Sequence, residues 1–104
     1  YSVYNFEKAD ISFLWKEFDL HEGECERLIS EYQSTKDQDE RNRFPLLAAY
    51  DQVLKCSNLF NTLDSRGAIS VTERVAVIAR VRTLAVGVAQ CWLDQQAIAT
   101  EVPT

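Results

Sequence analysis

The stretch Leu63–Arg74, read as Leu-Asp-Ser-Arg-Gly-Ala-Ile-Ser-Val-Thr-Glu-Arg, holds the end of one helix and the start of the next. Gly67 has no Cβ and can adopt the left-handed backbone that ends many helices. Ser70 and Glu73 have the Ser-x-x-Glu spacing of a capping box. In that motif the hydroxyl of Ser70 accepts from the amide of Glu73, and the carboxylate of Glu73 accepts from the amide of Ser70. The stretch therefore predicts a tight corner between two helices.

Apolar residues recur at spacings of three, four and seven on both sides of this corner and again near the N-terminus. Such spacing is typical of amphipathic helices. We predict helices over about residues 10–32, 45–65 and 71–97, with Asp10 capping the first and Pro45 in the first turn of the second. The third helix has an apolar stripe so wide that two partners are needed to cover it. The predicted fold is all-α, with the whole chain forming one domain, a three-helix up-down-up bundle.

Each predicted helix has its own apolar stripe. The first consists of Ile11, Leu14, Trp15, Phe18, Cys25, Leu28, Ile29 and Tyr32. The second consists of Leu46, Leu47, Tyr50, Val53, Leu54, Ser57, Phe60 and Leu63. On a helical wheel the third groups Val75, Ile78, Val81, Ala85, Val88, Ala89 and Trp92, with Val77, Leu84 and Cys91 widening it on one side.

The segment Gln33–Arg43 is polar, carries charges of both signs and has no apolar periodicity. These features predict a charged loop between the first two helices, and we expect it to be mobile and the first site of proteolytic nicking.

Composition describes an ordinary globular domain without a dominant nucleic-acid surface. The 104 residues are 46% hydrophobic and 26% charged, with a net charge of −5, whereas a nucleic-acid surface needs clustered Lys and Arg. The three cysteines, Cys25, Cys56 and Cys91, are odd in number and widely spaced, which predicts reduced thiols in a cytoplasmic protein. Three Gly and two Pro leave few helix breakers.

No membrane span or signal peptide is expected. The most apolar run, Val75–Leu93, contains Arg80 and Arg82, which are costly inside a bilayer. The chain starts at Tyr1 and contains no Met, so we expect it to be part of a longer polypeptide.

His21, Glu22 and Cys25 are the closest approach to a metal-binding set. His21 and Cys25 lie four residues apart, but no second cluster of ligands accompanies them. We therefore predict no metal site, and an exposed histidine on a polar helix face. The sequence contains neither a Ser, His and Asp order typical of a catalytic triad nor a Gly-rich phosphate loop, so no motif indicates catalysis.

Arg74 and Arg82 fall within or at the edge of the apolar sector of the third helix. An arginine that faces a core needs a carboxylate partner, because an unpaired buried charge costs several kcal/mol. Asp64 is the first candidate partner and Asp51 the second. We expect an Asp64–Arg74 pair that locks the corner, and that removing Arg74 destabilises the fold by about 3 kcal/mol if the pair is well buried.

Arg80 points away from the apolar sector on the same wheel, so we expect it to face solvent or a partner. Arg66, just before Gly67, is also available. For these arginines, contact with another subunit or with RNA phosphate stays open beside an internal ion pair.

One family resemblance covers about residues 3–96 and is strongest at the corner. It is carried by Tyr4-Asn5-Phe6-Glu7, Ala9-Asp10, Phe18-Asp19, His21-Glu22, Ala49–Ser57, Phe60-Asn61, Leu63–Arg74, Arg82, Leu84 and Ala85. Together these closely resemble the alpha chain of bacterial glycyl-tRNA synthetase, in the helical region after its catalytic domain. The charged Gln33–Arg43 segment departs from the family, whose usual connection there is shorter and Pro-rich.

The resemblance implies a class II aminoacyl-tRNA synthetase that joins glycine to its tRNA using ATP and magnesium. It implies as partners the chain's own upstream catalytic domain, a second alpha chain, a beta chain or fused beta region, and tRNA. The class II motifs lie upstream in that family, so no catalytic residue carries over to this segment. An independent three-helix adaptor that binds a partner helix is the alternative reading.

Overall fold

A computed structural model describes residues 11–101 of the chain. Its elements are α1 (Ile11–Ser34), α2 (Gln38–Arg43), α3 (Leu46–Ser65) and α4 (Val71–Glu101), and these residues contain no strand. The all-α prediction is confirmed, but four helices are present where three were predicted. The predicted N-cap Asp10 lies outside the described residues.

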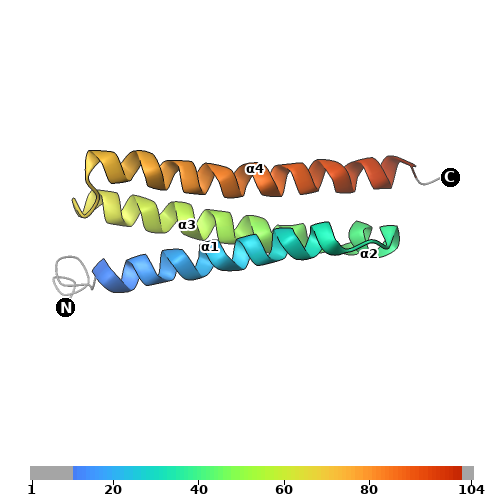
Figure 1. Cartoon of the computed structure of the whole chain (residues 1–104), viewed down its shortest axis with the longest axis horizontal. Helices are drawn as coiled ribbons and strands as arrows, with labels where there is room; N and C mark the ends of the chain where they lie inside the picture. The colour runs from blue at the N-terminus through green and yellow to red at the C-terminus, as the bar shows by residue number, and fades with distance from the viewer. Residues whose placement is uncertain (1–10, 102–104) are drawn as a thin grey trace.

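The three long helices α1, α3 and α4 lie side by side, and each packs against the other two (Figure 1). The corner between α3 and α4 lies at the end of the molecule where α1 begins. At the opposite end, short α2 packs against α4. The corner and α2 therefore hold opposite ends of the same set of helices.

The predicted loop at Gln33–Arg43 is wrong, because it contains α2. Asp37 caps this helix by accepting a hydrogen bond from the amide of Glu40 at 3.3 Å. Acidic residues occupy its first turn and basic residues its last, which complements the helix dipole. A six-residue helix needs no apolar stripe when its ends and polar side chains are held, so periodicity did not reveal it.

Arg41 connects α2 to its neighbours. Its guanidinium donates to the backbone oxygen of Gln33 at 3.0 Å and to Asp94 on α4 at 3.2 Å. The same group lies 5.1 Å from the ring centroid of Tyr32, whose hydroxyl donates to Asp94 at 2.6 Å. From α4, the side-chain amide of Gln95 donates to the backbone oxygens of Arg41 at 2.7 Å and Phe44 at 2.9 Å.

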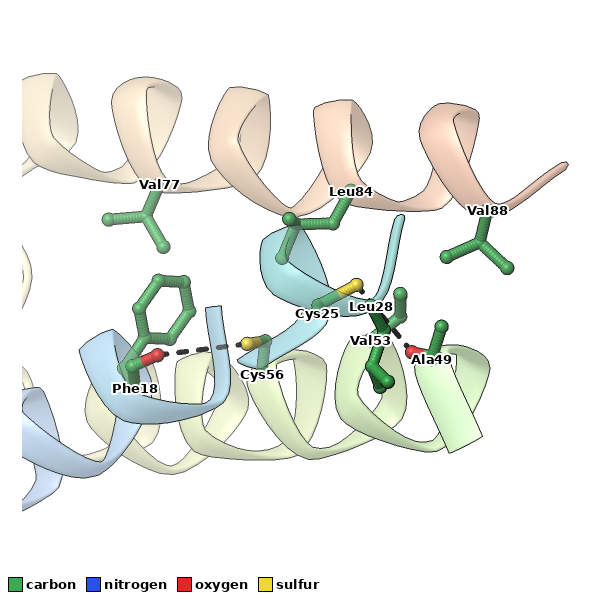
Figure 2. Packing of buried hydrophobic residues seen from close by; sticks show 9 residues of the cluster. All are labelled: Phe18, Cys25, Leu28, Ala49, Val53, Cys56, Val77, Leu84 and Val88. Carbon is green, nitrogen blue, oxygen red and sulfur yellow. Dashed lines mark hydrogen bonds between the residues drawn. The ribbon is translucent and has the colours of Figure 1, made fainter. Parts of the chain in front are cut away.

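The main core lies between the three long helices. Figure 2 shows its nine residues, three from each helix: Phe18, Cys25 and Leu28; Ala49, Val53 and Cys56; Val77, Leu84 and Val88. The thiol of Cys25 donates to the backbone oxygen of Ala49 at 3.6 Å, and that of Cys56 to Phe18 at 3.8 Å. The small residues Cys25, Ala49 and Cys56 lie where α1 meets α3 and allow the two backbones to approach. Burial of each large apolar side chain in this core stabilises the fold by about 1.5–3 kcal/mol.

The buried stripe of α1 includes Phe18, Cys25, Leu28 and Tyr32, as predicted, whereas on α3 and α4 only one side of each predicted stripe is buried. On α3 the buried residues are Leu46, Ala49, Val53, Cys56 and Leu63. On α4 they include Val77, Leu84, Val88, Cys91 and Ile98. Leu47, Tyr50, Leu54, Val75, Ile78 and Trp92, all assigned to the predicted stripes, are exposed. Both helices carry more apolar residues than one interface covers, so periodicity alone could not choose the covered side.

Residues 71–100 of α4 are long and apolar enough to cross a membrane by length and composition alone. The core helix of a soluble protein can have the same length and composition. In the bundle only 22% of its most apolar window is buried. The outer side of α4 therefore presents apolar surface that the described residues do not cover.

Candidate functional site

The corner between α3 and α4 forms through local backbone hydrogen bonds. Gly67 has a φ of 69°, as predicted, and its amide donates to the backbone oxygen of Asp64 at 3.0 Å. The amide of Ala68 donates to Leu63 at 3.0 Å, which completes a Schellman motif. Ile69 is buried and fixes the turn against the bundle. The direction of the chain at this corner is therefore set by residues within one helical turn of Gly67.

The capping box at the start of α4 is confirmed. The Glu73 amide donates to the Ser70 hydroxyl at 3.1 Å, and the Ser70 amide donates to the Glu73 carboxylate at 3.0 Å. Hydrogen bonding to the Glu73 carboxylate, first by the backbone amide of Ser70 and then by the Ser70 side chain, holds the pKa of Glu73 below its ordinary value of 4.5.

Arg74 pairs with Asp64, as predicted, across the corner. Its Nε and Nη2 donate to one oxygen of Asp64 at 3.0 Å and 2.6 Å. The pair is not well buried, because the Arg74 side chain remains 46% exposed, so the condition for a cost of about 3 kcal/mol is not met. Arg74 lies three residues before the buried Val77, so it is on the core-facing side of α4. It is nevertheless exposed, because it lies in the first turn of α4, at the end of the bundle. The second candidate, Asp51, instead pairs with Lys55 at 3.3 Å.

The prediction that Arg80 faces solvent or a partner is wrong, because its guanidinium is paired with α1, although the side chain stays 37% exposed. Its Nε donates to Glu22 at 2.9 Å and its Nη2 to Asp19 at 2.8 Å, both on α1. Its guanidinium carbon lies 4.7 Å from the centroid of the Phe18 ring. Hydrogen bonding to Glu22 is the largest cause that raises the pKa of Arg80 above its ordinary value. Arg80 therefore joins α4 to α1.

Arg66 and Arg82 complete the set of candidate arginines. Arg66 is the C-cap residue of α3 and is partly buried, and its amide donates to the backbone oxygen of Thr62 at 3.2 Å. Arg82 lies on the exposed side of α4, beside Ile78 and Ala85. Contact of Arg66 with a subunit or with tRNA stays a prediction.

The structure brings His21 and Cys25 into the α1–α3 interface. The Nδ1 of His21 lies 2.6 Å from the side-chain oxygen of Gln52, so the imidazole is not simply exposed on a polar face. Within residues 11–101, no three His, Cys, Asp or Glu side chains gather as a metal site would require.

The three cysteines are buried and free. Burial is the main cause that raises the pKa of the Cys25 and Cys56 thiols to about 11 and raises that of Cys91. A thiol with such a pKa stays protonated near neutral pH and is a poor nucleophile. These side chains therefore serve packing.

Comparison with known families matches residues 1–97 to the glycyl-tRNA synthetase alpha subunit. The chain belongs to this family. The sequence resemblance is thereby confirmed, and it extends across all three long helices.

Membership of the glycyl-tRNA synthetase alpha family identifies the protein as part of an aminoacyl-tRNA synthetase, an enzyme, and supports a glycine–tRNA ligase role. An alpha subunit of this family implies an assembly of alpha and beta chains that acts on tRNA.

Sequence reasoning missed the contact of Arg80 with Asp19 and Glu22. A signal existed, because two carboxylates three residues apart on one helix form an attractive site for an arginine on another. The pairing could not be chosen without knowing how α1 and α4 rotate toward each other.

Proposed function

We propose that this chain is the helical, non-catalytic region of a class II glycine–tRNA ligase. Its role is to support the catalytic domain and the assembly of alpha and beta chains, and its three long helices act as an up-down-up bundle. The family match over residues 1–97 carries the proposal. Catalysis, with ATP and magnesium, belongs to other parts of the cytoplasmic enzyme.

The engagement of the reactive side chains supports a structural role. His21 contacts Gln52, and the thiols of Cys25 and Cys56 contact backbone oxygens. Arg80 is occupied by two carboxylates of α1, and Arg74 by Asp64. Groups that are held in packing and ion pairs fix the shape of the bundle but are not free to bind a substrate.

The partners that follow are the upstream catalytic domain, a second alpha chain, the beta chain or a fused beta region, and tRNA. An independent adaptor that binds a partner helix is the alternative, and the family match favours the synthetase. A defect in this bundle should change aminoacylation if the chain is part of the synthetase, and should leave it unchanged if the chain is an independent adaptor.

A core substitution in the assembled synthetase tests the proposal. Leu84→Ala removes a buried side chain of the bundle, a change that costs about 2–5 kcal/mol of stability, whereas the neighbouring Thr83→Ala changes an exposed one. We expect Leu84→Ala to lower the fraction of assembled alpha–beta enzyme, measured by analytical ultracentrifugation. Glycine-dependent ATP–pyrophosphate exchange should fall in proportion, with KM for glycine and ATP unchanged, and Thr83→Ala should match the wild type.

Two outcomes would count against this role. A raised KM with assembly intact would show that the bundle binds substrate. Glycine-dependent exchange by the 104-residue chain alone would show that it is catalytic.

A further inference from the structure

A groove runs between α3 and α4. One part, about 660 Å³ in volume, lies between Leu47 and Tyr50 on one side and Ala89 and Trp92 on the other. A second part, about 380 Å³, lies between Phe60 and Ile78. Ala85 lines both parts, so they are neighbouring sections of one surface, which we call the α3–α4 groove.

Apolar residues on the two helices that flank this groove follow a seven-residue repeat. On α4 the buried residues Val77, Leu84, Cys91 and Ile98 are spaced by seven, and Val71, Ile78, Ala85 and Trp92 repeat one position later. On α3, Leu47 and Leu54 are also seven apart, with Tyr50 between them. Two adjacent seven-residue stripes on one helix are the pattern of a helix that packs against partners on two sides.

The second stripe is uncovered in the described residues. On this stripe Val71 is 76% exposed and Trp92 is 51% exposed, and Leu47, on the α3 side of the groove, is 80% exposed. Isolated apolar residues on a surface are ordinary, but a contiguous groove of them marks an interaction site. The stripe from Val71 to Trp92 is about 32 Å long at 1.5 Å per residue, which suits a helix of about 20 residues.

Arg82 sets the chemistry of the occupant. It lines the groove between Ile78 and Ala85, and within residues 11–101 it forms no hydrogen bond or ion pair. A helix that covers the groove removes water from this guanidinium, so the helix must supply a carboxylate to avoid an unpaired buried charge. A single arginine among apolar residues does not offer the clustered positive charge that RNA phosphates need.

The position of Arg82 argues against a second copy of this chain. Arg82 lies at the middle of the Val71–Trp92 stripe. Any two-fold pairing centred on the groove would therefore place the two Arg82 side chains close together, and like charges oppose such a contact. A different helix, acidic near its centre, satisfies both the apolar stripe and the charge.

We propose that the α3–α4 groove binds an amphipathic helix of the beta chain, with an Asp or Glu near the middle of that helix facing Arg82. The inference rests on the proposed role in subunit assembly and names the surface and the complementary chemistry.

Charge reversal in the alpha–beta enzyme tests this docking site. Arg82→Glu places a negative charge in the groove, and Lys16→Glu makes the same charge change at an exposed position of α1. We expect Arg82→Glu to weaken the affinity of the alpha chain for the beta chain by at least about tenfold, measured by isothermal titration calorimetry, and Lys16→Glu by less than about twofold. Ala85→Trp, which fills the groove without changing charge, should weaken the affinity as well.

The occupant is identified by a photo-crosslinking residue introduced at Ala85 of the assembled enzyme and by mass spectrometry of the product. A crosslink to a beta-chain helix with a central carboxylate supports the proposal, and replacing that carboxylate with Arg should restore binding to Arg82→Glu. A crosslink to a second alpha chain, to the alpha chain's own catalytic domain, to tRNA or to added lipid vesicles overturns it.

The same experiments separate this inference from the role on which it rests. If both groove variants bind the beta chain normally while Leu84→Ala still disrupts assembly, the groove proposal fails and the supporting role stands. If none of these variants affects assembly, both fail.

Discussion

The guanidinium of Arg80 stacks 4.7 Å from the ring centroid of Phe18 while it donates hydrogen bonds to Glu22 and Asp19. This one side chain joins the first third of α4 to α1 through both charge and aromatic contact. Phe18 is fully buried, and the Glu22 side chain is only 18% exposed. The contact is therefore partly shielded from water, in contrast to the Arg74–Asp64 pair at the corner.

We expect Arg80→Ala to destabilise the fold more than Arg74→Ala. Because Arg80 is itself 37% exposed, the loss should be at the lower end for charged hydrogen bonds, about 1–2 kcal/mol of unfolding free energy. Arg74→Ala should cost less than about 1 kcal/mol, since its pair is open to solvent. Urea denaturation of the two variants measures the difference, and an equal or larger loss for Arg74→Ala would refute this ranking.

Gly67 and Gly23 form a matched pair for testing backbone strain. A Cβ added at either position meets no atom within 4 Å, but only Gly67 has a positive φ. Gly67→Ala should therefore lower the unfolding free energy by about 1 kcal/mol through left-handed geometry alone. Gly23→Ala lies inside α1 and should raise it by about 0.5–1 kcal/mol. Thermal unfolding shifts of the same sign in both variants would contradict the expectation.

The capping box should make stability depend on pH through Glu73. The folded-state pKa of Glu73 is lowered, so its contribution is present above the ordinary value of 4.5 and is lost as pH falls through the lower folded value. Ser70→Ala should cost about 1 kcal/mol near neutral pH and should reduce this loss on the acid side. Urea denaturation between neutral and acidic pH measures both effects.

Glu73→Gln is the control for the capping box, since glutamine can still accept from the Ser70 amide but carries no charge. It should keep most of the cap and remove the part of the pH dependence that comes from Glu73. A pH profile that neither variant changes would contradict the assignment.

Gln95 should keep α2 in place. Its side-chain amide donates to the backbone oxygens of Arg41 and Phe44, so Gln95→Ala removes two hydrogen bonds that tie α2 and its C-cap to α4. We expect amide hydrogen exchange over residues 38–44 to increase by about tenfold, with residues 77–88 unchanged. Gln96→Ala, at an exposed neighbouring position, is the control. Fast exchange of residues 38–44 already in the wild-type protein would restore the sequence-based expectation of a mobile segment.

The sequence by itself determined the corner. Gly67, Ser70 and Glu73 act through dihedral preferences and hydrogen bonds within a few residues, so their spacing was sufficient to predict their geometry. The Arg74–Asp64 pair followed because the corner brings together two residues only ten apart. The bounds of the long helices were predicted to within a few residues for the same reason, since caps and breakers are local signals.

Only the tertiary structure decided which side of each helix is covered. Rotation of α3 and α4 about their axes depends on close packing with α1, and both helices have enough apolar residues to bury either of two adjacent stripes. That rotation places Arg80 against Glu22, 58 residues away, and leaves Arg82 in the α3–α4 groove. It also lets Asp94 and Gln95 hold α2, a helix without an apolar stripe. Such contacts join residues far apart in the chain, and no local pattern specifies them before the helices pack.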